Sequence, residues 1–161
     1  MNDVLAEAEP TQAALRHLRE LCARIAPVVA MQVEVDSFDG QRLQLRAPLA
    51  ANINDKGNAF GGSLVSLMTL AGWGLVNLQL HLRGIDAEVY VADSQVRYRA
   101  PLYDDLCAVA YLAEGESWEV FFDTLAKRGR ARLQMETGIP LAEGGVATEM
   151  SARFVAIMKG G

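Results

Sequence analysis

The chain has few of the residues that mark secreted or metal-binding proteins. It contains only two cysteines, Cys22 and Cys107, which lie far apart and outside any metal-ligand spacing, so neither a disulfide framework nor a zinc site is indicated. The N-terminus lacks the basic region and long apolar run of a signal peptide. We therefore expect a protein of the reducing cytoplasm, and no residue pattern indicates a metal or redox cofactor.

Positive charge is also scarce. The 15 lysines and arginines are outnumbered by 20 aspartates and glutamates, which gives a formal net charge of −5 and argues against sequence-independent binding of nucleic acid. There is no long Ser, Pro or Gln tract, no internal repeat and no linker, while 51% of the residues are hydrophobic. The 161 residues suit a single domain with one core, spanning residues 1–161.

Two hydrophobic periods divide the chain into elements. Apolar residues at three- and four-residue spacings, beginning after a possible cap at Thr11, predict an N-terminal helix over about residues 11–26. The period then changes to two on either side of Asp39-Gly40, which predicts a hairpin. Further strands are expected at residues 88–98, 106–112, 130–139 and 146–157, with a short helix at 118–127.

The segment from about residue 62 to residue 82 is apolar on nearly every side, so the helix that it predicts must be enclosed. Polar residues interrupt the segment too often for a lipid-facing membrane span. Strands joined by short turns favour a mainly antiparallel sheet. The order of elements therefore predicts an α+β domain whose sheet curls round one long central helix, a hotdog-like arrangement.

A polar, glycine-bearing turn at residues 54–63 leads directly into this helix. A helix start leaves backbone N–H groups without intrahelical partners and carries a partial positive charge, so it can bind an anion or a developing oxyanion. Gly61 and Gly62 have no Cβ to hold a ligand away. The alternative is that the two glycines only allow a buried helix to pack closely.

Several motifs in order resemble a known family. They include Ala59-Phe60-Gly61-Gly62-Ser63-Leu64, Ala71-Gly72-Trp73-Gly74-Leu75 and Ala92-Asp93-Ser94. Over about residues 14–158 the chain resembles the thioesterase-like domain found at the C-terminus of YiiD-type proteins, within the hotdog-fold superfamily. The resemblance implies a homodimer or a larger assembly such as a homotetramer. It also implies that an acyl thioester of coenzyme A or of acyl carrier protein binds at a subunit interface.

Related phenylacetate-type hotdog thioesterases share an Asn-x5-His-Gly-Gly pattern and an acid nine residues after the His. In this chain Asn54 matches the Asn, Phe60 stands in place of the His, and Thr69 stands in place of the acid. The chain therefore either uses another acid or does not hydrolyse thioesters.

Hydrolysis needs a carboxylate and fixed donors to the carbonyl oxygen. The N–H of Gly62, with that of Gly61 or Ser63 beside it, could supply the donors. Asp93 is the leading acid because it lies mid-strand among valines; the alternative is that it pairs with Arg97 or with an arginine on a neighbouring strand.

The sequence leaves more than one role possible for the other candidate residues. Asn54 could orient water or the carbonyl, or form an Asx turn, and Thr69 could act at the site or bond to its own helix. Asp55 is a second candidate acid, and strand parity puts Ser94 on the face opposite to Asp93 unless a bulge intervenes. The phosphates of coenzyme A could meet Lys56, Arg97 or Arg99, or the basic cluster Lys127, Arg128, Arg130 and Arg132, which also fits a solvated strand face. His17 and His81 are expected in solvated or capping roles.

Three functions follow from these patterns. The first is an acyl-thioester hydrolase, which the residue 54–63 turn and Asp93 favour. The second is a non-catalytic domain that binds acyl-CoA or acyl carrier protein, which Phe60 and Thr69 favour because relatives have a His and an acid there. The third is a dehydratase acting on hydroxyacyl thioesters, which usually pairs a His with an acid.

Overall fold

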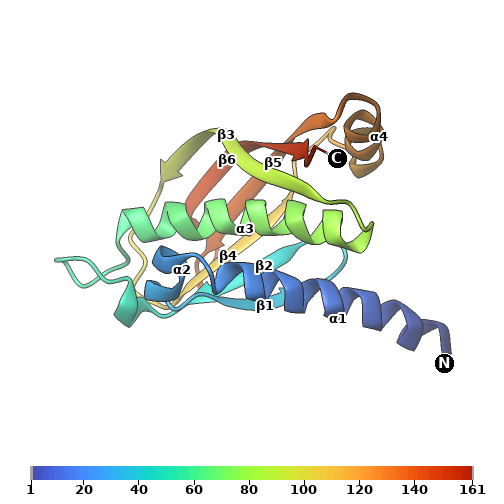
Figure 1. Ribbon diagram of the computed structural model, residues 1–161. Helices are drawn as coiled ribbons and strands as arrows, with labels where there is room; N and C mark the ends of the chain where they lie inside the picture. Colours follow the sequence, from blue (N-terminus) through green and yellow to red (C-terminus); the bar gives the residue numbers. More distant parts are fainter. Residues whose placement is uncertain (1, 161) are drawn as a thin grey trace.

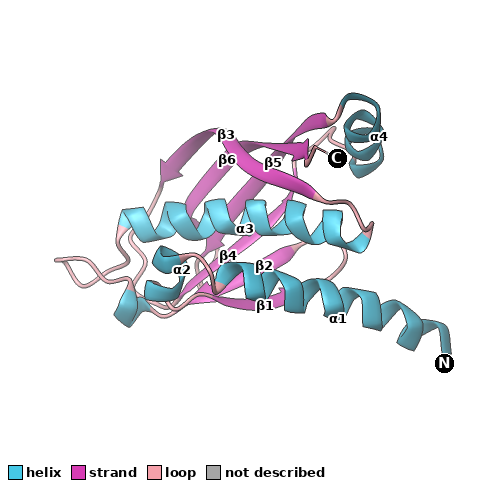
Figure 2. Cartoon of the chain, in the orientation of Figure 1, coloured by secondary structure: helices cyan, strands magenta, loops and turns pink. Residues whose placement is uncertain are grey.

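The computed structural model describes residues 2–160 and contains one antiparallel sheet wrapped round a long helix (Figures 1 and 2). The sheet has six strands in the order β1-β2-β4-β5-β6-β3. The strands are β1 (Glu34–Phe38), β2 (Leu43–Ala47), β3 (Ala87–Tyr98), β4 (Leu106–Leu112), β5 (Arg130–Pro140) and β6 (Val146–Met158). The helices are α1 (Asn2–Cys22), α2 (Ala26–Ala30), α3 (Gly61–Leu82) and α4 (Trp118–Arg128), with a 3-10 turn at Leu49–Ala51. The α+β hotdog fold expected from the sequence is confirmed.

The central helix α3 lies across one face of the sheet and packs on β2, β4, β5, β6 and β3. It is long and apolar enough to cross a membrane by composition, yet 72% of its most apolar window is buried within the fold, as in the core helix of a globular protein. It ends at Leu82, and Arg83 and Gly84 follow, with Gly84 at φ +64°. The N–H of Ile85 donates to the Leu80 carbonyl and that of Gly84 to the His81 carbonyl, which is the Schellman arrangement.

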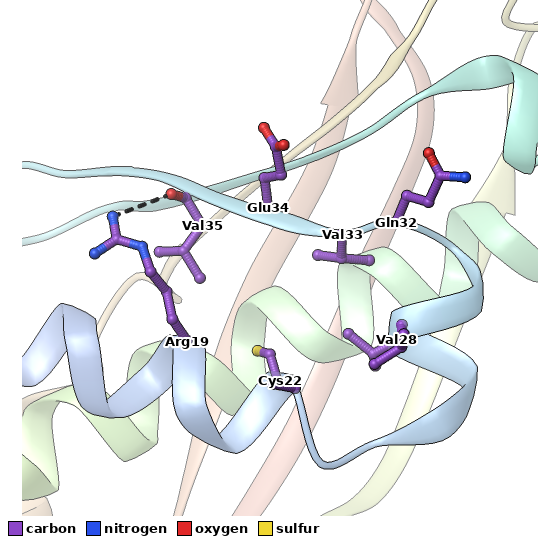
Figure 3. Close-up of a pocket in the computed structure, with 9 residues that line it drawn as sticks. Arg19, Cys22, Val28, Gln32, Val33, Glu34 and Val35 are labelled. Carbon is purple, nitrogen blue, oxygen red and sulfur yellow. Dashed lines mark hydrogen bonds between the residues drawn. The ribbon is translucent and has the colours of Figure 1, made fainter.

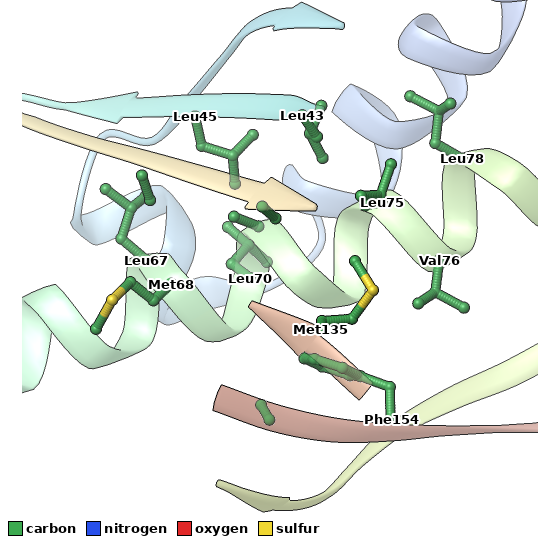
Figure 4. Close-up of a cluster of buried hydrophobic side chains, with 14 of the residues drawn as sticks. Leu43, Leu45, Leu67, Met68, Leu70, Leu75, Val76, Leu78, Met135 and Phe154 are labelled. Atoms are coloured by element: carbon green, nitrogen blue, oxygen red, sulfur yellow. The ribbon is translucent and has the colours of Figure 1, made fainter. Parts of the chain in front are cut away.

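Buried and outward-facing residues alternate along β5 and β6, and the buried ones supply the other half of the core. Ala131, Leu133, Met135, Thr137 and Ile139 of β5 are buried, and the residues that alternate with them face the outer side of the sheet. In β6, Phe154 is fully buried and lies with Met135 against α3 (Figure 4). Close approach is possible because Gly72 of α3 faces the Phe154 ring: a Cβ on Gly72 would lie 2.6 Å from Phe154 Cε2.

The N-terminal helix has different bounds from the expected 11–26. It runs from Asn2 to Cys22, and a tight turn then leads into α2, which has Pro27 in its first turn, where a missing N–H does no harm. Hydrophobic spacing missed the early part: residues 8–10 are exposed, and Ala14 is the first buried residue among those whose burial is described. The expected helix therefore began too late, and it ran past Cys22 to the first residue of α2.

Helix α1 packs on α3, and there His17 and His81 stack with ring centroids 4.4 Å apart and planes inclined by 20°. Partial burial, followed by the charge of His17, lowers the pKa of the His81 imidazole below its usual value. The solvated or capping role expected for the two histidines is therefore incomplete, because they also contact each other between two helices.

We expect this pair to make stability depend on pH. The folded protein favours neutral His81. The stability that this residue contributes is therefore fully present above the pKa of a histidine in the unfolded chain, and it is lost as the pH falls below that pKa. The change in Tm between about pH 7.5 and about pH 5.5 should therefore be smaller for His81→Gln than for the parent protein. An equal or larger change in the variant would contradict this.

Candidate functional site

A cavity of about 340 Å³ runs beside α3. One face of the helix lines it, through Val65, Ser66, Thr69, Leu70 and Trp73, residues spaced at three and four positions. The remaining walls are Val91 of β3 and Phe154 of β6 on the sheet side, and Ile25 and Val28 on the α2 side. The cavity is therefore mainly apolar, and the hydroxyls of Ser66 and Thr69 add polar atoms beside the helix.

The cavity begins one turn after the start of α3. The first intrahelical hydrogen bond there runs from the Leu64 N–H to the Phe60 carbonyl at 3.1 Å, so the N–H groups of Gly61, Gly62 and Ser63 precede the helical ladder. The Tyr98 hydroxyl donates to the Gly61 carbonyl at 3.2 Å, which links β3 to the helix start. The helix dipole and these N–H groups make this end of α3 suited to a partial negative charge.

Phe60 covers this helix start. A Cβ on Gly62 would lie 2.3 Å from Phe60 Cε1, so the phenyl ring packs directly against the glycine. The ring is also 56% exposed to solvent. A side chain at position 62 would therefore displace the Phe60 ring, which is exposed enough to move. Ser63 beside it is buried.

Asn54 is occupied within its own loop. Its Oδ1 accepts hydrogen bonds from the backbone N–H groups of Lys56 (2.8 Å) and Asn58 (3.2 Å), and its Nδ2 donates to Asn58 Oδ1. This is the Asx-turn arrangement. Lys56 and Asp55 pair with each other at 3.0 Å and are both highly exposed. In this structure Asn54 shapes the loop, and its side-chain amide does not face the cavity.

Asn52, two residues earlier, is the buried asparagine of this region. Its side-chain Nδ2 donates to the backbone carbonyls of Met31 (2.9 Å) and Pro48 (2.8 Å). Its backbone carbonyl accepts from the Phe60 N–H at 2.7 Å. It is 3% exposed, and its Oδ1 has no protein partner. Asn52 therefore ties the end of α2 and the end of β2 to the start of α3. Sequence reasoning missed this role, because the contact with Met31 joins residues 21 positions apart in the chain.

Asp93 lies on the wrong face of the sheet for an acid acting at α3. A β-bulge between Val91 and Asp93 shifts the register, so Asp93 pairs with Arg153 on the outer face. Asp93 Oδ2 accepts from Arg153 Nε at 2.9 Å and also from its terminal nitrogen, and both side chains are about half exposed. The cross-strand ion pair, the alternative left open by the sequence, is therefore the arrangement observed. A direct role for this carboxylate at its own α3 is not supported.

The same bulge turns Ser94 toward the helix side, opposite the buried Ala152. Ser94 is exposed near the edge of the sheet. Arg97 lies on the outer face opposite Glu149. Glu149 binds Arg99 at 2.5 Å, and the hydrogen bond from Arg99, with the charge of Arg97 contributing less, lowers the pKa of the Glu149 carboxyl. These two arginines therefore belong to a charged network on the face away from the cavity.

The basic cluster is split between two elements. Lys127 pairs with Asp123 one turn earlier on α4, at 2.8 Å. Arg130 and Arg132 alternate with buried residues on β5, so they lie on its outer face. This is the solvated-face arrangement, which the sequence left open beside phosphate binding.

Thr69 is the one expected site residue that lines the cavity. Its hydroxyl lies 3.8 Å from Met150 Sδ. Nearby, Trp73 Nε1 donates to the Val89 carbonyl at 3.1 Å, which holds the indole against β3. Of the described residues, the nine that line the cavity include no Asp or Glu.

Proteins of known structure share this fold. The structure is similar to that of a protein of unknown function from Chlorobaculum tepidum, which is 28% identical, with a TM-score of 0.85 over 93% of this chain and 97% of that one. It is also similar to a protein from Shewanella oneidensis described as a putative thioesterase, which is 28% identical, with a TM-score of 0.79 over 91% and 99% of the two chains. The PaaI protein of the E. coli phenylacetic acid degradation operon shares the fold, with 14% identity and a TM-score of 0.65 over 94% and 96%.

The family match covers most of the chain. Residues 16–158 match the family described as "Putative thioesterase (yiiD_Cterm)". The match includes the glycine-bearing start of α3 and every residue that lines the cavity beside it. The chain belongs to this YiiD C-terminal thioesterase family, and its fold is the hotdog fold of thioesterase proteins.

Proposed function

We propose that this protein is an acyl-thioester hydrolase acting on acyl-CoA or on acyl carrier protein thioesters. The observation that carries the proposal is the apolar cavity along α3, which begins one turn after a helix start that offers free N–H groups. A hydrocarbon chain fits the cavity walls, and a thioester carbonyl fits the helix start.

In this proposal the N–H of Gly62, with that of Gly61 or Ser63, stabilises the negative charge that develops on the carbonyl oxygen. Water attacks the carbonyl carbon, the carbon–sulfur bond breaks, and the thiol leaves with a proton. The Thr69 hydroxyl would position that water, because Thr69 lines the cavity. Phe60 would cover the reacting group from solvent, Asn54 would shape the loop, and Ser94 would lie at the sheet-side edge.

Phosphate contacts would come from the loop side. Lys56 is exposed in the turn that precedes α3, so it could meet a phosphate of coenzyme A or of the carrier's prosthetic group. Arg97 faces the other side of the sheet, which makes it a weaker choice for a ligand in this cavity.

A second copy of the chain would complete the site. Strand β3 is a 12-residue edge strand that presents exposed Tyr90, Val91 and Tyr98, and long apolar edges are normally covered. We propose a homodimer, or a tetramer built from it, that pairs along β3 and brings partner residues toward Val91 and the cavity. We place it in the reducing cytoplasm, where Cys22 and Cys107 would stay unpaired.

A non-catalytic acyl-thioester binding domain is the second candidate. It is favoured by the lining of the cavity, which includes no carboxylate from the described part of the chain. The dehydratase hypothesis has less support, because His17 and His81 stack between α1 and α3 and neither lines the cavity.

The test is release of free thiol from acyl-CoAs and acyl carrier protein thioesters of graded chain length. Thr69→Val keeps the shape of the side chain and removes the hydroxyl, so kcat/KM should fall by about 10- to 100-fold. Asp93→Asn should keep kcat/KM within about two-fold, because Asp93 faces away from the cavity.

The outcomes separate the candidates. Saturable binding without thiol release from any substrate would favour the binding domain. Loss of turnover in folded Asp93→Asn, with Thr69→Val fully active, would overturn the roles assigned here. Circular dichroism of each variant checks that it is folded.

A further inference from the structure

A second cavity, of about 520 Å³, lies beside α2 (Figure 3). Its walls come from the end of α1, from α2 and from the edge strand β1 with the turn before it. Among the described residues that line the two cavities, Val28 is the one they share. Val28 therefore lies where the two spaces meet.

The side of the second cavity nearest Val28 is apolar. Cys22, Val33 and Val35 lie on the same side of β1 as Val28, whereas Gln32 and Glu34 extend from the other side (Figure 3). Burial raises the pKa of the Cys22 thiol to about 11, so this thiol is neutral at physiological pH. This side of the cavity suits a hydrocarbon.

Arg19 lies at one end of the same space. Its guanidinium donates to the Val35 carbonyl at 3.4 Å, which occupies a backbone group at the free edge of β1. The cation is therefore directed toward the strand backbone, and the apolar part of the space lies between Arg19 and Val28 (Figure 3).

Val28 is held firmly in place. Its N–H donates to the Ile25 carbonyl at 2.9 Å, its carbonyl accepts from the Val33 N–H, and its side chain is 9% exposed. The Met31 carbonyl just after α2 is bound by Asn52 Nδ2. A short helix fixed at both ends makes a rigid wall.

We propose that Val28 sets the longest acyl chain that the α3 cavity accepts, and that the second cavity is a reserve space closed by this side chain. The inference rests on the proposed function, in which the acyl chain lies along α3. A chain that fills the first cavity would end against the Val28 methyl groups. Longer chains are then excluded, because the apolar space beyond Val28 is out of reach.

Changing the size of this one side chain should therefore shift the length profile. Each methylene that enters an apolar cavity tightens binding by about four-fold. Val28→Ala opens the wall, so the optimum should move to chains longer by about two carbons, and the long-to-short ratio of kcat/KM should rise by about ten-fold. Val28→Leu extends the wall and should move the optimum to shorter chains.

The measurement uses saturated acyl-CoAs of graded length, with thiol release and displacement of a fluorescent long-chain acyl-CoA as two readouts. Val29→Ala is the matched control, because Val29 neighbours Val28 on α2, lines only the second cavity of the two and is 55% exposed. Its length profile should equal that of the parent protein.

Unchanged profiles in both Val28 variants, with an active or acyl-binding parent protein, would overturn the inference and leave the proposed function standing. A parent protein that neither releases thiol nor binds the acyl probe would overturn the proposed function, and the inference with it. Should Val28→Ala fail to fold, Val28→Leu decides alone, because a shift to shorter chains supports the inference and no shift overturns it.

Discussion

Asn52→Asp should destabilise the protein by about 3–5 kcal/mol at neutral pH. The substitution removes both N–H donors of the side chain and places a buried carboxylate against the carbonyls of Met31 and Pro48. The site is 3% exposed, so water cannot solvate the charge. The measurement is the urea midpoint of unfolding, interpreted with the m-value of the parent protein.

Asn54→Asp is the matched control, since it makes the same substitution two residues away. Asn54 Oδ1 accepts from two backbone N–H groups, and a carboxylate accepts those bonds equally well. The substitution removes the bond from Asn54 Nδ2 to Asn58 Oδ1, but the Asn58 amide can turn its own N–H groups toward the new carboxylate, so the change should stay within about 1 kcal/mol. The Asn52→Asp deficit should also shrink as the pH falls from about 7 to about 5, because a protonated carboxyl regains one donor. Equal stability of the two variants would show that the Asn52 bonds contribute little.

Gly72→Ala should destabilise the protein by about 2 kcal/mol, although alanine is the better helix former. The new methyl would lie 2.6 Å and 2.7 Å from two ring carbons of Phe154. Phe154 is fully buried between α3 and the sheet, so the ring has no free space into which it can move. Thermal unfolding of the variant should show a Tm several degrees lower.

Gly74→Ala is the control on the same helix. A Cβ at that position would lie 3.0 Å from Leu43 Cδ2 and 3.4 Å from the Leu18 methyl groups, which can shift by a few tenths of an ångström. The gain in helix propensity offsets this crowding, so the change should be within about 1 kcal/mol. Adding Phe154→Leu to Gly72→Ala should recover part of the loss in a double-mutant cycle. A Gly72→Ala protein as stable as Gly74→Ala would contradict the close contact.

The fold could be predicted because its elements differ in hydrophobic period. Helix α3 is apolar on all sides, and β5 and β6 alternate with a period of two, so the enclosed helix and the antiparallel strands were both evident. The early part of α1 could not be predicted from hydrophobic spacing; residues 8–10, the first whose burial is described, are exposed.

The site was less predictable because its contacts join distant parts of the chain. The glycine-bearing helix start and Thr69, which lines the cavity, both belong to a local motif, so the sequence alone makes them candidates. The role of Asn52 depends on Met31, which is 21 residues away, and the wall at Val28 depends on α2 packing beside α3. Neither contact has a local pattern in the sequence.

The bulge at Ala92 also affects how relatives should be aligned with this chain. Before the bulge Val89 and Val91 face α3, and after it Ser94 and Val96 do, so the inward positions change from odd to even numbers along one strand. A relative whose strand has the same length but no bulge would keep the odd-numbered positions inward, and it would direct the carboxylate that matches Asp93 toward its helix. Two aspartates in the same alignment column could therefore lie on opposite sides of the sheet, and a catalytic role should be transferred between these proteins only after the strand register has been compared.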